Sequence, residues 1–169
     1  MSNAFKIGKL YGVGVGPGDP ELMTRKAVRV LREVPVIAAP NSSGKGEAGS
    51  NALEVIKSSV RIETKTIMEI ALPMTKDKTA LKAARDKAAD TLAGTLEKGL
   101  DIAFVTLGDP MLYATFSYLV PLVKERLPDV RVEAVPGITS FCAAACAAML
   151  PLAEGSERVA IVPAAYGLE

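Results

Sequence analysis

The sequence contains no histidine and only two cysteines among its 169 residues. Without imidazole, Ser-His-Asp catalysis, Cys-His catalysis and every histidine-based metal site are excluded. The cysteines, Cys142 and Cys146, lie in an alanine-rich run. Two thiols cannot complete a four-ligand zinc site, and a C-x-x-x-C-x-x-C iron–sulfur motif needs a third cysteine. We therefore predict no metal site, and two small cysteines buried on a packed helix.

Charge of one sign and long hydrophobic runs are also missing. The formal net charge is +1, which removes the basic signal of a general nucleic-acid binder. No apolar run reaches the roughly 18 residues that a transmembrane helix needs, so we expect no membrane partner. No charged segment followed by an apolar segment opens the chain, which predicts a cytoplasmic protein. A chain of this length can bury roughly 70% of its unfolded surface, so it needs no disulfide.

The sequence alternates short apolar runs with amphipathic stretches. Runs rich in valine and isoleucine and bounded by glycine and proline predict strands at residues 10–15, 36–39, 61–67, 102–106, 131–135 and 159–162. Helical spacing predicts helices at residues 21–33, 51–58, 76–97, 111–126 and 138–150. This alternation predicts an α/β fold with a mostly parallel sheet and helices on both faces. Ligands of such sheets bind beyond the carboxyl ends of the strands.

Two loops of similar sequence follow the first and the fourth predicted strands. Gly-Asp-Pro occurs at residues 18–20 and again at residues 108–110. An aspartate at the N-cap and a proline at the first helical position explain a helix start after each loop. We therefore predict that Asp19 and Asp109 cap the helices that follow them. This explanation leaves the glycines that precede them unexplained.

Four glycines alternate after the first predicted strand, where residues 12–20 are GVGVGPGDP. Such glycines let ligand atoms approach the backbone closely. A phosphate-binding P-loop requires Gly-Lys-Ser/Thr at the helix start, where Asp19 and Pro20 stand instead. A dinucleotide fingerprint requires an acidic residue at the end of the next strand, and the sequence there is AAPN. A glycine-rich turn without any ligand stays open as an alternative.

Three motifs in order resemble the signatures of the tetrapyrrole (corrin/porphyrin) methyltransferases. They are YGVGVGPGDPELMTRKA at residues 11–27, TLGDPMLYATFSYL at residues 106–119 and VPGITSF at residues 135–141. The resemblance extends over nearly the whole chain from Lys9 onward. The second motif is most similar to the branch that methylates C20 of precorrin-2. Departures from the uroporphyrinogen-III branch at residues 39–43 and 113–117 argue against that substrate.

The resemblance implies an S-adenosyl-L-methionine cofactor, bound in a cleft between two α/β domains. It assigns cofactor contacts to Pro17, Leu107, Gly108, Asp109, Leu112, Thr139 and Ser140, with Leu107 in place of a family glycine. The substrate would be a tetrapyrrole, and we predict that it contacts Lys45, Met111 and Tyr113. Asp109 would oppose the positive charge of the cofactor. No catalytic residue can be named from the sequence.

The domain organisation follows from the same resemblance. We expect an N-terminal domain at residues 1–150, a linker at 151–157, and the start of a truncated second α/β domain at 158–169, which leaves the activity of this chain alone in doubt. The family's usual arrangement implies a homodimer. Methyl transfer from a sulfonium depends mainly on holding donor and acceptor aligned, which suits a chain without histidine.

Several alternatives remain open on sequence grounds. The acceptor could be another corrin position, a diphthamide precursor or ribosomal RNA. A nicotinamide-dependent oxidoreductase on the same kind of sheet, or an inactive fragment serving in assembly, are alternatives from other classes.

Overall fold

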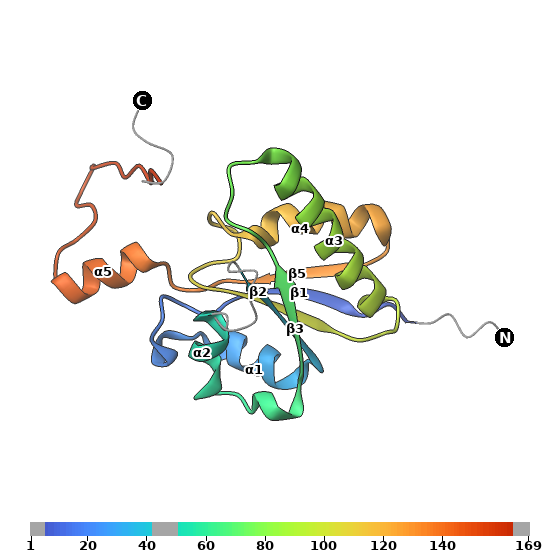
Figure 1. Cartoon of the computed structure of the whole chain (residues 1–169). Helices are drawn as coiled ribbons and strands as arrows, with labels where there is room; N and C mark the ends of the chain where they lie inside the picture. The colour runs from blue at the N-terminus through green and yellow to red at the C-terminus, as the bar shows by residue number, and fades with distance from the viewer. Residues whose placement is uncertain (1–5, 42–50, 164–169) are drawn as a thin grey trace.

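The computed structural model of the chain describes residues 6–41 and 51–163. Five parallel strands form one sheet in the order β3-β2-β4-β1-β5 (Figure 1). The strands are β1 (Lys9–Gly14), β2 (Val36–Asn41), β3 (Thr66–Ala71), β4 (Ile102–Thr106) and β5 (Arg131–Val135). The central strand β4 is almost wholly apolar and buried, as expected of a parallel strand covered on both faces. The predicted parallel α/β fold is confirmed.

In the described part of the chain, four α-helices and two short 3₁₀ turns connect the strands, and a fifth α-helix follows β5. The α-helices are α1 (Arg25–Glu33), α2 (Asn51–Lys57), α3 (Lys78–Leu96), α4 (Thr115–Arg126) and α5 (Ser140–Ala148), and the 3₁₀ turns are η1 (Pro20–Leu22) and η2 (Ile62–Thr64). Side-chain caps explain two of the helix starts. The Thr24 hydroxyl accepts the Ala27 N–H at 3.1 Å, and Asp77 accepts the Thr79 N–H at 2.8 Å.

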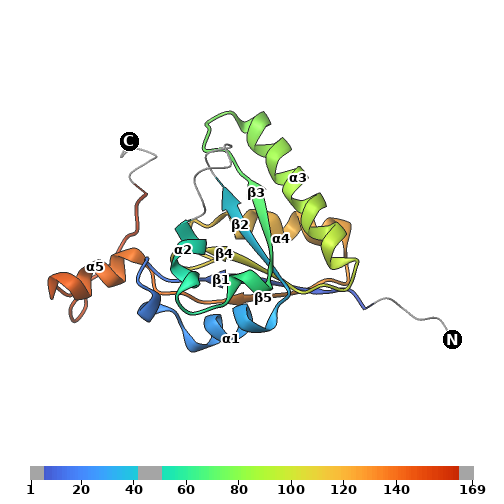
Figure 2. The same cartoon turned by 60° about the horizontal axis from the view of Figure 1, so that its bottom comes forward.

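Helices cover both faces of the sheet, as predicted. Helices α1 and α2 lie on one face and α3 and α4 on the other, which Figure 1 and the turned view in Figure 2 both show. Each pair packs its apolar side against the strands and encloses a separate core. Leu31 and Ile56 belong to the first core, and Leu92, Phe104 and Phe116 belong to the second. Helix α5 lies beyond the carboxyl end of the sheet and covers neither face (Figure 2).

Two predicted strands and the predicted burial of the cysteines differ from the structure. The third strand occupies 66–71 instead of 61–67, because Ile62–Thr64 forms the 3₁₀ turn η2. The predicted strand at 159–162 is not formed: within the described residues no strand pairs with this segment, and it is exposed throughout. Cys142 and Cys146 are exposed on α5 instead of buried, because α5 does not pack on the sheet within the described residues.

The predicted cap at Asp19 is confirmed for a short 3₁₀ helix instead of α1, and the predicted cap at Asp109 is wrong. Helix α1 begins at Arg25 behind Thr24, and Asp19 instead caps the short turn η1 by accepting the Glu21 N–H at 2.9 Å. Helix α4 begins only at Thr115, six residues after Asp109. Asp109 is therefore free of the helix-capping role and serves another contact.

Candidate active site

The three motifs converge at the carboxyl edge of the sheet. Strand β1 lies between β4 and β5, and its residue Gly14 is paired with Thr106 while Val13 is paired with Val135. The three strands therefore end at the same level, and the loops that follow them start side by side. Gly16 and Gly108 form an antiparallel bridge between the first two loops, in which the Gly108 N–H donates to the Gly16 carbonyl at 2.8 Å.

Three glycines, one from each motif, meet backbone against backbone; we call Gly14, Gly108 and Gly137 the glycine contact. A Cβ atom on Gly137 would lie 2.0 Å from the Gly108 carbonyl oxygen. A Cβ on Gly14 would lie 2.4 Å from the same oxygen. Real Cβ contacts are never this short, so only glycine fits at Gly14 and Gly137. The sequence hypothesis gave Gly14 and Gly108 to a ligand, but protein backbone occupies the space beside Gly14.

Two other glycines of the first motif, Gly12 in β1 and Gly18 in the loop after it, differ in their surroundings. Gly12 faces the Phe116 ring, and a Cβ there would lie 2.2 Å from a ring carbon. Gly18, by contrast, has a φ of +135° and no atom within 4 Å of a Cβ position. Protein therefore occupies the space beside Gly12, where the hypothesis of close ligand approach fails, whereas the backbone at Gly18 is open and close ligand approach there stays a prediction.

Asp109 joins the second loop to the third. One carboxylate oxygen accepts the Met111 N–H at 2.8 Å, and the other accepts the Gly137 N–H at 3.0 Å. The side chain is half-buried. Hydrogen bonds to an ionised acceptor are stronger than neutral ones, so this carboxylate holds the two loops together.

Thr139 presents a buried polar atom without a protein partner. It is the N-cap residue of α5, but its side chain makes no capping hydrogen bond. Its hydroxyl oxygen is the one side-chain polar atom in the described ranges that is buried and lacks any hydrogen-bond partner. A buried, unpaired hydroxyl costs about 1–3 kcal/mol, which a ligand that hydrogen-bonds to it would recover. The Thr139 Cα lies 4.0 Å from a Cβ position at Gly108, so this hydroxyl belongs to the same loop cluster.

Exposed apolar side chains surround this cluster. Leu107, Met111, Tyr113 and Ile138 are all exposed, and Met111 and Tyr113 each expose more than half of their surface. A few polar groups among apolar walls is the usual composition of a cofactor or small-molecule site. Of these four, Ile138 was not predicted from the sequence as a site residue.

Tyr113 combines an unusual backbone with a long-range contact. Its φ is +48°, in the left-handed region that residues other than glycine rarely adopt. Its hydroxyl donates to the Ile161 carbonyl oxygen at 3.1 Å. The loop after β4 is thereby tied to the segment that follows α5, a contact between residues 48 positions apart.

The remaining predicted residues are placed as follows. Pro17 and Leu112 are half-buried in the first and second loops, and Ser140 is exposed at the first turn of α5. Lys45 lies outside the described residues. Contacts between the loops bring Gly108, Asp109 and Thr139 of the predicted cofactor set together. The cofactor contacts of these residues and of Pro17, Leu107, Leu112 and Ser140 stay a prediction.

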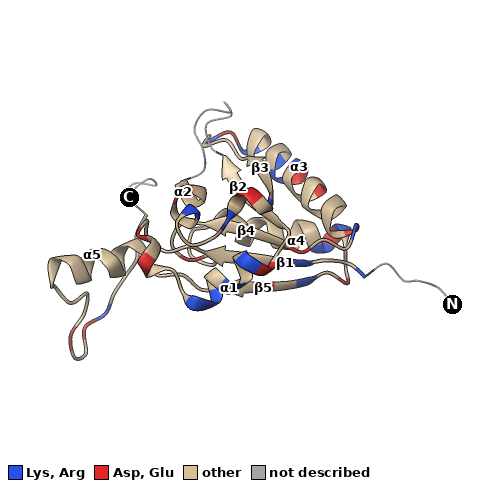
Figure 3. Ribbon diagram, turned by 90° about the horizontal axis from the view of Figure 1, so that it is seen from below, with Lys and Arg blue, Asp and Glu red and all other residues tan. Residues whose placement is uncertain are grey.

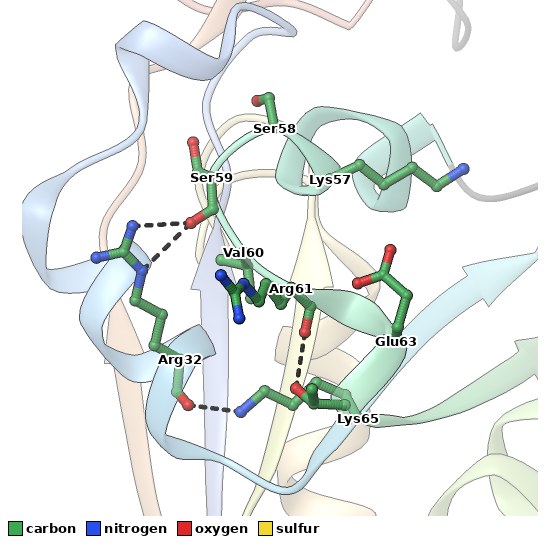
Figure 4. A pocket seen from close by; sticks show the side chains of 9 residues that line it. Arg32, Lys57, Ser58, Ser59, Val60, Arg61, Glu63 and Lys65 are labelled. Atoms are coloured by element: carbon green, nitrogen blue, oxygen red, sulfur yellow. Dashed lines mark hydrogen bonds between the residues drawn. The ribbon is translucent and has the colours of Figure 1, made fainter.

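A cavity of about 560 Å³ lies elsewhere, at the amino edge of the sheet (Figure 4). Its lining includes Arg32, Lys57, Arg61 and Lys65. Two of these cations already serve the fold: Arg32 donates to the Ser59 carbonyl at 2.9 Å, and Lys65 donates to the Val34 carbonyl at 2.8 Å. This cavity is far in the fold from the three motif loops, and the carboxyl edge remains the candidate site.

The ion pairs among the described residues lie away from the candidate site. Helix α5 carries no charged residue, whereas charges line α1 and α3 (Figure 3). The Glu133 carboxylate on β5 forms two ion pairs: the Nζ atoms of Lys9 and of Lys26 in α1 each lie 2.5 Å from one of its oxygens. Hydrogen bonds from Lys26 and, to a smaller extent, from Lys9 lower the pKa of Glu133 to about 2. The hydrogen bond to Glu133 in turn raises the pKa of Lys9. No helix within the described ranges is both long and apolar enough to cross a membrane.

Comparison with known proteins agrees with the motifs. The sequence model of the family described as Tetrapyrrole (Corrin/Porphyrin) Methylases matches residues 9–169. A Methanocaldococcus jannaschii protein named "Probable cobalt-precorrin-2 C(20)-methyltransferase" is 45% identical over 96% of this chain and 67% of its own length. The Salmonella typhimurium cobalt-precorrin-2 C(20)-methyltransferase is 34% identical over 92% of this chain and 63% of its own length. The chain thus spans about two thirds of the length of these curated relatives.

A solved structure gives the same result for the fold. The uroporphyrin-III C-methyltransferase of Thermus thermophilus, in complex with S-adenosylhomocysteine, superposes with a TM-score of 0.57. It is 26% identical, and the match covers 88% of this chain and 55% of that one.

Proposed function

The chain belongs to the tetrapyrrole (corrin/porphyrin) methylases, and from that premise we propose that it methylates C20 of precorrin-2 or cobalt-precorrin-2 in cobalamin biosynthesis. The methyl donor is S-adenosyl-L-methionine, the cofactor of this family. The choice of acceptor is supported by two relatives named for cobalt-precorrin-2, which match over more than nine tenths of this chain.

One observation carries the proposal: the three motif loops meet at the glycine contact, and beside Gly108 the Thr139 hydroxyl is buried and has no partner among the described residues. An adenosyl group offers an apolar surface together with hydroxyl and amine groups, and it needs few but well-placed polar partners. Leu107 and Ile138 supply exposed apolar surface beside Thr139. The residues present therefore fit the cofactor.

The residues of this site act mainly by positioning. When bound, the cofactor supplies a methyl group that its sulfonium already activates. The loops hold the donor, and the exposed side chains of Met111 and Tyr113 offer an apolar face to a macrocycle. Holding two reactants aligned at about 3–3.5 Å can supply several kcal/mol of the barrier without any acid or base. Contact between Lys45 and a substrate carboxylate remains part of the proposal.

The finer assignments are proposals as well. We place the domain boundary at 151–157, which is supported by the end of α5 at Ala148 and by Met149 in a left-handed conformation after it. We also propose a cytoplasmic homodimer. The apolar surface of α5 and the segment after it supports this, since Met149 and Leu150 are 87% and 67% exposed. Light scattering of the purified protein would measure the mass, and a monomer at micromolar concentration would contradict the dimer.

Calorimetry with S-adenosylhomocysteine tests the cofactor. We expect binding, and we expect Thr139→Val to weaken it about tenfold, because the variant removes a hydrogen bond worth about 1.5 kcal/mol to the ligand. Thr91→Val is the matched control, since the Thr91 hydroxyl donates only to the Lys87 carbonyl within α3. Binding of a nicotinamide dinucleotide in place of S-adenosylhomocysteine would overturn the proposal in favour of an oxidoreductase.

The acceptor needs a separate experiment. The protein is incubated with precorrin-2 and with S-adenosyl-L-methionine carrying a ¹³C-labelled methyl group, and the product is mapped by carbon NMR. We expect the label at C20. A label on another ring carbon would leave the methyltransferase in place and overturn the C20 assignment.

A further inference from the structure

Both oxygens of the Asp109 carboxylate accept hydrogen bonds from backbone groups. Each of its two oxygens accepts one N–H, from Met111 in its own loop and from Gly137 in the loop after β5. A carboxylate held in this way is fixed in orientation by two charge-assisted hydrogen bonds. The resemblance to the family had assigned this residue to the cofactor instead.

Gly137, which donates one of these two hydrogen bonds, has little room to move. The residue is already confined by the Gly108 carbonyl and by the Gly14 backbone, which leave no room for a single added carbon. Asp109 supplies the hydrogen bond that completes the confinement. Thr139 follows two residues later, so the position of its unpartnered hydroxyl depends on where Gly137 is held.

We infer that Asp109 is a positioning residue: it ties the loop after β4 to the loop after β5 and thereby sets the place of Thr139, and it is not the partner of the cofactor's ammonium group. This rests on the proposed function, because Thr139 matters only if the cofactor binds there. The tether itself is a property of the chain without any ligand.

The other Gly-Asp-Pro loop provides a matched control. Asp19 has the same neighbours in sequence, and it accepts the Glu21 N–H at 2.9 Å within its own turn. Within the described part of the chain, no hydrogen bond links its side chain to another loop. Asp19 is exposed, so the same substitution there alters only a local turn.

The affinities of two ligands distinguish a positioning role of Asp109 from a direct contact with the cofactor. S-adenosylhomocysteine carries the ammonium group, and 5′-methylthioadenosine keeps the adenosyl and thioether groups but lacks the amino acid part. We expect Asp109→Asn to weaken both ligands by the same factor, about tenfold, and Asp19→Asn to change neither by more than about twofold. If Asp109→Asn weakens S-adenosylhomocysteine alone, the carboxylate binds the ammonium and the inference is overturned. We expect Asp109→Ala to weaken the binding of both ligands as Asp109→Asn does. Asp109→Glu keeps the charge and tests whether a longer carboxylate restores the affinity.

The tether has a readout that needs no ligand. Amide exchange followed by NMR should show faster exchange of the Gly137 N–H by about tenfold or more in Asp109→Asn, while amides of β4 keep their protection. Unchanged Gly137 exchange in the variant would overturn the tether. If the unmodified chain binds neither ligand, the proposed function fails, while the amide measurement still decides whether the tether exists.

Discussion

The two ends of the sheet differ in their side-chain contacts. At the carboxyl edge, backbone meets backbone: Gly14 and Gly137 leave no room for a Cβ beside the Gly108 carbonyl. At the amino edge, a Cβ on Gly8 would likewise lie 2.1 Å from the Leu100 carbonyl oxygen, but long side chains also meet backbone carbonyls there, as Lys65 does with the carbonyls of Arg32 and Val34. A backbone contact has no adjustable part, whereas a lysine can take another rotamer and keep its charge in water.

The lysine contacts at the amino edge are therefore adjustable, whereas the backbone contact at Gly14, Gly108 and Gly137 is not. The carboxyl edge holds the candidate site, and there a displaced loop would also displace Thr139. The amino edge holds a cationic cavity, yet two of its cations stabilise the ends of helices and turns. Cavity size and positive charge alone therefore give a poor guide to function in this chain.

The largest expected effect is a loss of stability from a substitution at the carboxyl edge of the sheet. We expect Gly137→Ala to lower the free energy of unfolding by about 3 kcal/mol, because the new methyl group overlaps the Gly108 carbonyl and the backbone must shift. Gly94→Ala is the matched control: it lies in α3 with no atom within 4 Å of its Cβ position, and it should stabilise by about 0.5–1 kcal/mol. Urea unfolding measures both. Equal effects of the two substitutions would contradict the glycine contact.

An intermediate effect concerns Glu133, which lies between the two edges on β5. Its carboxylate has a pKa of about 2 in the folded chain, against about 4.3 for an unperturbed glutamate. Because the folded pKa is lowered, the stabilisation is complete above about pH 4.3 and is lost as the pH falls towards 2. The groups are partly exposed, so we expect at most about 1 kcal/mol.

Glu133→Gln should remove this pH dependence. Thermal unfolding between pH 5 and pH 2.5 would show a smaller loss of stability in the variant than in the unmodified chain. Parallel curves over that range would mean that Lys9 and Lys26 do not stabilise the carboxylate.

The smallest expected effect tests the amino edge. Lys65→Met removes the contacts to the Arg32 and Val34 carbonyls near the end of α1, and we expect a loss of about 0.5 kcal/mol in unfolding free energy. Lys57→Met is the matched control, because Lys57 pairs only with Glu54 within α2 among the described residues. A loss above 2 kcal/mol for Lys65→Met would show that the amino edge is as intolerant as the carboxyl edge.

Much of the sheet follows from the sequence because buried strands differ sharply from their surroundings. The strands at 102–106 and 131–135 have the predicted bounds, since the first is an apolar run and the second alternates charged residues with valine and alanine. The third strand was misplaced because Ile62 is apolar but belongs to a turn, while Glu69 is polar but belongs to the strand. Helix starts were misplaced where Asp-Pro signalled a cap, because Thr24 caps α1 instead.

The candidate site was predictable as a set of loops but not as a set of contacts. A parallel sheet brings the carboxyl ends of its strands to one edge, so the three motifs could be expected together. The pairing of Asp109 with Gly137 joins residues 28 positions apart, and no local pattern signals it. Likewise, only the packed loops show that Gly14 contacts protein and that Thr139 lacks a partner.

The strand order has a consequence for how the chain folds. Strand β1 pairs only with β4 and β5, and Leu10 is separated from its partner Ile102 by about ninety residues. At a synthesis rate of about 5–20 residues per second, β1 emerges on the order of 5–20 s before β4 does. An apolar strand that waits this long is at risk of pairing with other chains. Gly12 and Gly14 weaken the strand as a pairing partner, so the residues that permit close packing in the folded protein also protect the nascent one.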